Sequence, residues 1–324
     1  MMKYILKRLL MTIPMMIGIS FITFLCIFMA PGGPAAGIMQ DLNPKVSPEY
    51  RQKLVEHYHF DKPVTVQYAL WVKSLLKLDF GTSYKDGQPV MKKIAERLPK
   101  TLLLTGLSLI LAFILAVPIG IFSALKHNTW WDRAFTVFVF LGYSIPAYWI
   151  ALLLMILFGI HLGWFPVTGF RSILADEMSL PARVWDIMKH LALPMIVTGL
   201  TGLASLSRYM RNGMLEVIQQ DYVRTARAKG LPENKVILVH ALRNTLIPVI
   251  TILGFSLPDL ISAGVIFETI FSYPGLGRLA YEAVMTRDTF LIMPTVAFAA
   301  LLTLLGNLIA DVCYAYADPR IRFR

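Results

Sequence analysis

Six long apolar runs constrain this sequence more than any other feature. Each has roughly 20 or more predominantly apolar residues, which is about the length that an α-helix needs to cross the hydrocarbon core of a bilayer. Backbone N–H and C=O groups have no water to bond inside lipid, so these runs should be helical. The runs are Leu9–Met29, Thr101–Ala124, Ala134–Ile160, Leu191–Met210, Thr245–Phe267 and Phe290–Tyr314.

The composition agrees with this interpretation. Of the 324 residues 56% are hydrophobic and only 16% are charged, whereas about 25% of the residues of a soluble domain are charged. Disordered chains are charge-rich and apolar-poor, so disorder is excluded as well. The sequence therefore predicts an all-α membrane protein with six transmembrane helices. Its net charge of +11 fits basic cytoplasmic loops better than nucleic-acid binding.

The distribution of Lys and Arg predicts that both termini are cytoplasmic, because the loops that are then inside hold more of these residues than the two short outer loops. Four regions follow: a cytoplasmic N-terminus and first helix (1–30), an extracytoplasmic helical segment (31–100), a transmembrane domain (101–314) and a cytoplasmic tail (315–324). The first run also resembles a signal peptide. Because it exceeds the 7–15 apolar residues typical of one, a retained helix is expected.

The outer segment shows helical apolar spacing over Tyr50–Phe60 and Val66–Leu78, and a short basic amphipathic stretch, Val90–Lys100, ends at Pro99. Two interpretations stay open. The segment is an interfacial helix that shields the edge of the bundle, a docking surface for an extracytoplasmic partner, or both.

The inner segment 211–244 has a helix–break–helix pattern. Gly230 follows good helix formers at the position where a helix end favours a left-handed residue, and Arg227 and Lys229 in the last turn oppose the helix dipole. Pro232 then allows a new helix to begin. This pattern is typical either of a connector lying on lipid headgroups or of a short helix that another protein contacts. The candidate contact residues are Arg224, Thr225, Ala226, Arg227, Ala228, Lys229, Gly230 and Leu231.

No catalytic or metal motif appears in the sequence. The phosphate-binding G-x-x-x-x-G-K-[ST] loop, H-E-x-x-H, G-x-S-x-G and C-x-x-C are all missing. His57 and His59 lack carboxylate or sulfur neighbours at a useful spacing, and Cys26 and Cys313 lie in apolar runs. We therefore expect no enzyme activity, no metal site and no cofactor in this chain.

Polar side chains within the spans are candidates for lining a pathway. An intramembrane carboxylate such as Asp259 is a functional candidate by default, although polar groups also serve helix packing. Because such groups are few, the energy source is expected outside the chain. An ion-coupled secondary transporter and a membrane scaffold are the alternatives. The candidate residues are Tyr143, Ser144, Thr198, Thr201, Ser256, Asp259 and Ser262.

The segment from Asp221 to Leu231 resembles the EAA loop of permease subunits of bacterial ABC importers, in particular the oligopeptide, dipeptide and nickel branch. Arg224-Thr225-Ala226 stands where the wider pattern has Glu-Ala-Ala. This departure from the wider pattern is common in the peptide branch. Further matching motifs are Pro31-Gly32-Gly33-Pro34, Asp79-Phe80-Gly81-Thr82-Ser83, Gly142-Tyr143-Ser144-Ile145-Pro146, His240-Ala241-Leu242-Arg243-Asn244 and Tyr273-Pro274-Gly275-Leu276-Gly277.

This resemblance implies a division of labour. The chain would pair with a second, similar permease as a heterodimer in the bacterial inner membrane. Two ATPase subunits, which hold ATP and Mg²⁺, would bind the loop from the cytoplasm, and a binding protein would deliver the substrate from outside. The substrate would be a dipeptide, an oligopeptide, a nickel chelate or another small solute. Residues 211–244 would then transmit ATP-driven motion to the spans.

Overall fold

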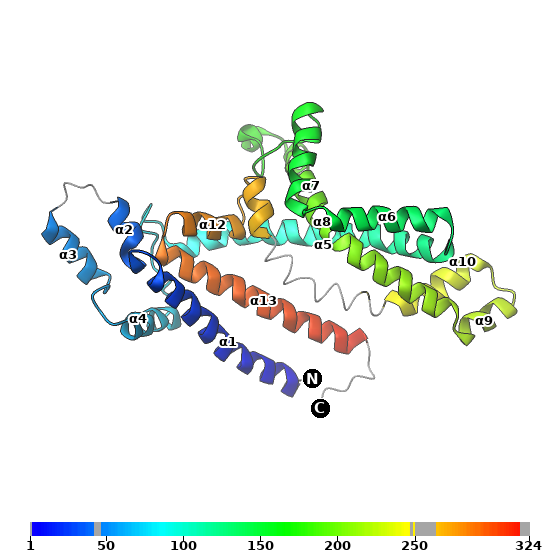
Figure 1. The fold of residues 1–324 in the computed structure, drawn as a ribbon, viewed down its shortest axis with the longest axis horizontal. Coiled ribbons are helices and arrows are strands. Elements are labelled where there is room, and N and C mark those ends of the chain that lie inside the picture. The colour runs from blue at the N-terminus through cyan, green and yellow to red at the C-terminus, as the bar shows by residue number, and fades with distance from the viewer. Residues whose placement is uncertain (1, 42–46, 247–248, 250–263, 318–324) are drawn as a thin grey trace. The chain divides into compact units, whose positions relative to one another are not determined.

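The computed structural model describes residues 2–41, 47–246, 249 and 264–317. All regular elements among these residues are helices, and the only extended pairing there is an isolated bridge between Thr82 and Pro89. The chain divides into two compact units, one formed by residues 1–101 and 274–304 and the other by 102–273 and 305–324. Figure 1 labels the helices of both units.

The first unit begins with a long apolar helix and continues through short helices. Its core forms where the start of α5 packs against two later helices: Val90 and Ile94 are fully buried against Leu276 and Leu279 of α12 and Leu291 of α13. The elements are α1 (Met2–Met29), η1 (Gly33–Ala35), α2 (Ala36–Asp41), α3 (Pro48–His57), α4 (Val64–Leu76), the first turns of α5 (Val90–Leu125), α12 (Leu276–Met285) and most of α13 (Thr289–Ala317).

The predicted helices of the outer segment are confirmed by α3 and α4, with ends shifted by a few residues. The stretch Val90–Lys100 does not end at Pro99, because α5 runs through this residue without a break. The buried contacts of Val90 and Ile94 hold these first turns against α12. Tertiary packing thus outweighs the local helix-breaking signal of proline.

The second unit contains the rest of α5 and the chain up to residue 273. Its elements are α6 (Trp130–Ser144), α7 (Ala147–Leu154), the π-helix η2 (Met155–His161), the 3₁₀ helix η3 (Ile173–Glu177), α8 (Leu180–Ile218), α9 (Asp221–Ala228), α10 (Glu233–Lys235) and the π-helix η4 (Val236–Ala241).

Helices α5 and α8 run in the same direction and touch between Ser108 and Gly120 of α5. A Cβ added at Gly199 would lie 3.1 Å from the carbonyl oxygen of Ser108, and one added at Gly120 would lie 2.5 Å from Cβ of Met210. Residue numbers therefore increase in the same direction along both helices. Between these two contacts, Ala116 of α5 packs with buried apolar residues of α8.

Four helices among the described residues are long and apolar enough to cross a membrane: Ile5–Met29, Val90–Leu125, Leu180–Ile218 and Thr289–Val312. They contain the first, second, fourth and most of the sixth predicted runs. The third run is not one continuous helix, because it breaks at Ile145–Pro146 into α6 and α7 and continues as the π-helix η2. Proline lacks the N–H that a continuous helix would need there. The fifth run lies mostly outside the described residues.

Candidate functional site

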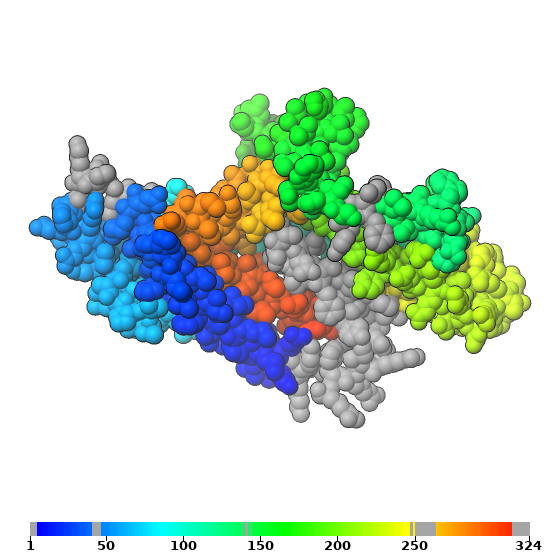
Figure 2. Space-filling view, viewed as in Figure 1, coloured from blue at the N-terminus to red at the C-terminus, as the bar shows by residue number. Residues whose placement is uncertain are grey.

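The candidate site is the bend that follows α8, defined here as the elbow (residues 219–241). Helix α8 ends at Ile218, and α9 begins two residues later at Asp221. Figure 1 shows α9 and α10 at the C-terminal end of α8. Figure 2 shows the elbow, in yellow-green, on the surface of the second unit.

Sequence and backbone agree at both ends of α9. Asp221 lies in the first turn and Arg227 in the last, so each charge opposes the helix dipole. Gly230 has φ +75°, in the left-handed region predicted for it. The Gly230 N–H donates to the Arg227 carbonyl (2.9 Å) and the Leu231 N–H to the Ala226 carbonyl (3.4 Å). These two bonds form a Schellman motif, which ends the helix and turns the chain sharply.

One face of α9 packs against the rest of the elbow. Val223 and Val236 have no exposed surface and Ala226 has 5%, and these three side chains form an apolar cluster with Val217 and Leu231 packed against it. The alternation of apolar positions along α9 therefore fixes which face turns inward. Ala226, a predicted contact residue, faces this cluster, and Leu231 is half-buried.

The remaining surface of α9 and its C-cap is exposed, and three of its seven residues are basic. It consists of Asp221, Tyr222, Arg224, Thr225, Arg227, Ala228 and Lys229. Gly230 is exposed as well, and nothing lies within 4 Å of the position that its Cβ would take. The structure thus brings the predicted contact residues, apart from Ala226 and Leu231, onto one accessible surface.

Two polar contacts of the elbow were not predicted from the sequence. Arg227 forms an ion pair with Glu233 of α10, with 2.7 Å between Nη2 and Oε1. Its hydrogen bond holds the pKa of the Glu233 carboxyl below its ordinary value. The Asn244 side-chain amide donates to the Tyr222 hydroxyl over 2.8 Å. Opposite charges on either side of a Gly-Leu-Pro turn are the signal that would have pointed to the first contact.

The structure describes the side chains of only three predicted pathway residues, Ser144, Thr198 and Thr201, and these differ in exposure. Thr198 is buried in α8, whereas Thr201 is exposed and donates to the Thr198 carbonyl over 2.6 Å. Ser144 is exposed at the end of α6. The pathway role of these residues stays a prediction. Ser256, Asp259, Ser262 and the side chain of Tyr143 lie outside what the structure describes.

Two family models together match nearly the whole chain. "Binding-protein-dependent transport system inner membrane component" matches residues 116–323, and the model for the N-terminal part of such membrane components matches residues 1–105. The chain belongs to this family. It is therefore a multi-pass protein of the inner membrane and the permease component of an ABC importer, in a complex with other ABC subunits. Members of this family are not themselves the ATPase.

Curated relatives of the binding-protein-dependent transport family match over their full length. The oligopeptide transport system permease protein AppB of Bacillus subtilis is 41% identical, with 99% of each chain covered. The dipeptide transport system permease proteins DppB of Alkalihalophilus pseudofirmus and Escherichia coli are 37% and 35% identical, with both chains fully covered.

The fold itself resembles that of a chain in a solved structure of an ABC transporter. An inward-facing structure of the MetNI methionine ABC transporter superposes with a TM-score of 0.52 at 16% identity, and the match covers 69% of this chain and 98% of the other. At this identity the likeness shows the fold alone.

Proposed function

We propose that this chain is one of two permease subunits of an ATP-driven peptide importer, and that ATPase subunits bind at the elbow. The observation that carries the proposal is the two-sided α9: an apolar face buried against Val236, and an exposed face with Arg224, Arg227 and, at the C-cap, Lys229. A helix anchored in this way moves together with the rest of the elbow when a partner pushes on its exposed face. Part of the force on α9 would then reach α8 directly.

The proposed orientation has six spans and both termini in the cytoplasm, with the elbow on the same side. The parallel direction of α5 and α8 supports it. If both helices cross the membrane, the chain between them has to cross back once, and α6, α7 and η2 are the elements available for this crossing. The break at Pro146 then lies within the third span, where neighbouring helices satisfy the freed backbone groups.

Peptides are the proposed substrates. The full-length relatives from three bacteria carry the names of oligopeptide or dipeptide permeases at 35–41% identity. We further propose a second, similar permease as the partner in the membrane, an extracytoplasmic binding protein, and two ATPase subunits that hold ATP and Mg²⁺. This chain would need no cofactor of its own and would contribute half of the pathway.

Reconstitution tests the proposal against an ion-coupled transporter. The chain is co-purified with its ATPase subunits, placed in vesicles with the binding protein, and supplied with labelled dipeptides or oligopeptides. Uptake should require ATP on the side of the membrane where the ATPase subunits lie. It should persist without any ion gradient. Uptake by the chain alone under an ion gradient, or ATP-driven uptake of a nickel chelate but of no peptide, would contradict the proposal.

A further inference from the structure

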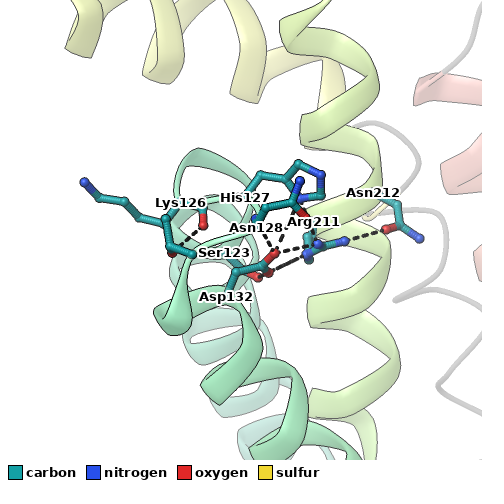
Figure 3. A network of polar contacts seen from close by, with 8 residues as sticks. Ser123, Lys126, His127, Asn128, Asp132, Arg211 and Asn212 are labelled. Carbon is teal, nitrogen blue, oxygen red and sulfur yellow. Dashed lines mark hydrogen bonds and ion pairs between the residues drawn. The ribbon is translucent and has the colours of Figure 1, made fainter.

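A partly buried ion pair ties the end of α8 to the turn between α5 and α6. We call this contact the polar joint; it consists of Ser123, His127, Asn128, Asp132 and Arg211 (Figure 3). Asp132, near the start of α6, is only 4% exposed. Its carboxylate is the centre of the joint, and every other member lies within hydrogen-bond or ion-pair distance of it.

The carboxylate of Asp132 is fixed to its own turn. The Ser123 hydroxyl donates a short hydrogen bond to Oδ1, and the Asn128 backbone N–H donates to Oδ2 over 3.1 Å. Asn128 has φ +62°, a left-handed conformation that asparagine tolerates better than most residues. The position of the carboxylate is therefore set by the end of α5 and the turn after it.

Arg211 of α8 donates two hydrogen bonds to this carboxylate. Its Nε lies 2.8 Å from Oδ1 and its Nη2 lies 2.8 Å from Oδ2, which is the parallel fork geometry of a bidentate pair. The Arg211 hydrogen bonds hold the pKa of Asp132 well below its ordinary value, so the carboxylate is charged at neutral pH. A bidentate pair depends on the orientation of both partners, not only on their separation.

The joint lies close to the elbow along one uninterrupted helix. Arg211 is about two helical turns before the end of α8 at Ile218. Directly beside it the two backbones are almost in contact, because a Cβ at Gly120 would lie 3.0 Å from the Arg211 backbone nitrogen. The end of α5, the turn after it and the end of α8 are thus held together by an ion pair and by close packing.

Stability alone does not account for a charged pair at this place. Partly buried ion pairs contribute little net free energy, because desolvation offsets the attraction. Apolar contacts are not directional, whereas the bidentate pair specifies one orientation of α8 against the α5–α6 turn. From this we infer that Asp132 and Arg211 are positioning residues that make the α5–α6 turn move with the elbow. The inference rests on the proposed function, in which the elbow receives the force from the ATPase subunits.

The inference is tested by the ratio of peptide uptake to ATP hydrolysis in the reconstituted complex. Asp132→Asn keeps the shape of the side chain but removes its charge, and the ratio should fall at least tenfold while ATP hydrolysis stays within about twofold of the wild-type rate. The swap of Asp132→Arg with Arg211→Asp should recover part of the ratio. Asp176→Asn is the matched control, because it removes another bidentate pair, with Arg171, in the same unit, and it should leave the ratio unchanged.

A second measurement keeps all five residues of the polar joint. It tests the inference even if the Asp132 and Arg211 variants do not assemble. Spin labels are attached to cysteines at Lys126, in the α5–α6 turn, and at Glu216, near the end of α8, with Cys26 and Cys313 replaced by alanine. The distance between the labels should be the same in the nucleotide-free and ATP-trapped complexes. A distance that changes between the two states, or an unchanged uptake ratio in Asp132→Asn, would overturn the inference. If the wild-type complex itself does not take up peptide with ATP, the proposed function fails instead.

Discussion

Arg227 and Glu233 face each other across the turn at Gly230. The Arg227 Nε lies 3.2 Å from Oε2 of Glu233 and its Nη2 lies 2.7 Å from Oε1, so the end of α9 and the start of α10 are joined by two hydrogen bonds. The Schellman motif closes the same turn through the backbone. The angle between α9 and the chain that follows is therefore set twice, once by the backbone and once by side chains.

Gly230→Val should uncouple ATP hydrolysis from uptake. Space is not the problem, since nothing lies within 4 Å of the added Cβ, but the left-handed conformation at φ +75° costs a side chain about 1–2 kcal/mol and a β-branched one most. The turn should open and α9 should leave its orientation. We expect assembled complexes that hydrolyse ATP at a near-normal rate and take up peptide at a reduced rate. Gly230→Asn, which tolerates the left-handed region, is the control; equal transport by the valine variant would contradict a role for this turn.

Glu233→Gln should weaken coupling with little effect on folding. The pair is partly exposed, so its loss should change the free energy of unfolding by less than about 1 kcal/mol. Because Arg227 lowers the pKa of Glu233, the contribution of the pair is present above the ordinary carboxyl pKa and disappears only as the pH falls through the lowered value. The difference in uptake between the wild type and the variant should therefore be constant from pH 6 to pH 8. A difference that vanishes on going from pH 8 to pH 6 would mean that another group is responsible.

Two glycines of α5 should respond to alanine with opposite signs. At Gly120 the new Cβ would lie 2.5 Å from Cβ of Met210, and such overpacking typically costs about 1–3 kcal/mol. At Gly106 nothing lies within 4 Å, so alanine should stabilise the helix by about 0.5–1 kcal/mol. Thermal unfolding of the detergent-solubilised chain measures both. Similar melting temperatures for the two variants would contradict the close approach of α5 and α8.

Much of the elbow could be predicted from the sequence because its signals are local. Gly230 marks the left-handed turn, so the helix and its end follow from neighbouring residues. The inner face was not predicted, because Ala226 was expected among the contact residues and is instead buried with Val223 and Val236. The apolar runs likewise predict the long helices, since length and hydropathy are properties of one segment.

The rest depends on contacts between segments that are far apart in the sequence. Asp132 and Arg211 are 79 positions apart, and no local pattern shows that the carboxylate of one will meet the guanidinium of the other. The continuation of α5 through Pro99 depends in the same way on α12, which is nearly 200 residues away. Whether a polar residue such as Thr198 lines a pathway also depends on the partner subunit, which the sequence of one chain does not contain.

Site-directed cross-linking shows whether an ATPase subunit contacts the exposed face of α9. Single cysteines are placed at Arg224, Thr225 and Lys229 on the exposed face of α9 and, as the matched control, at the buried Ala226, in a chain without Cys26 and Cys313 and in complex with its ATPase subunits. We expect cross-links to an ATPase subunit from the exposed positions and none from Ala226. Failure at every exposed position, in a complex that is assembled and hydrolyses ATP, would contradict the proposed contact.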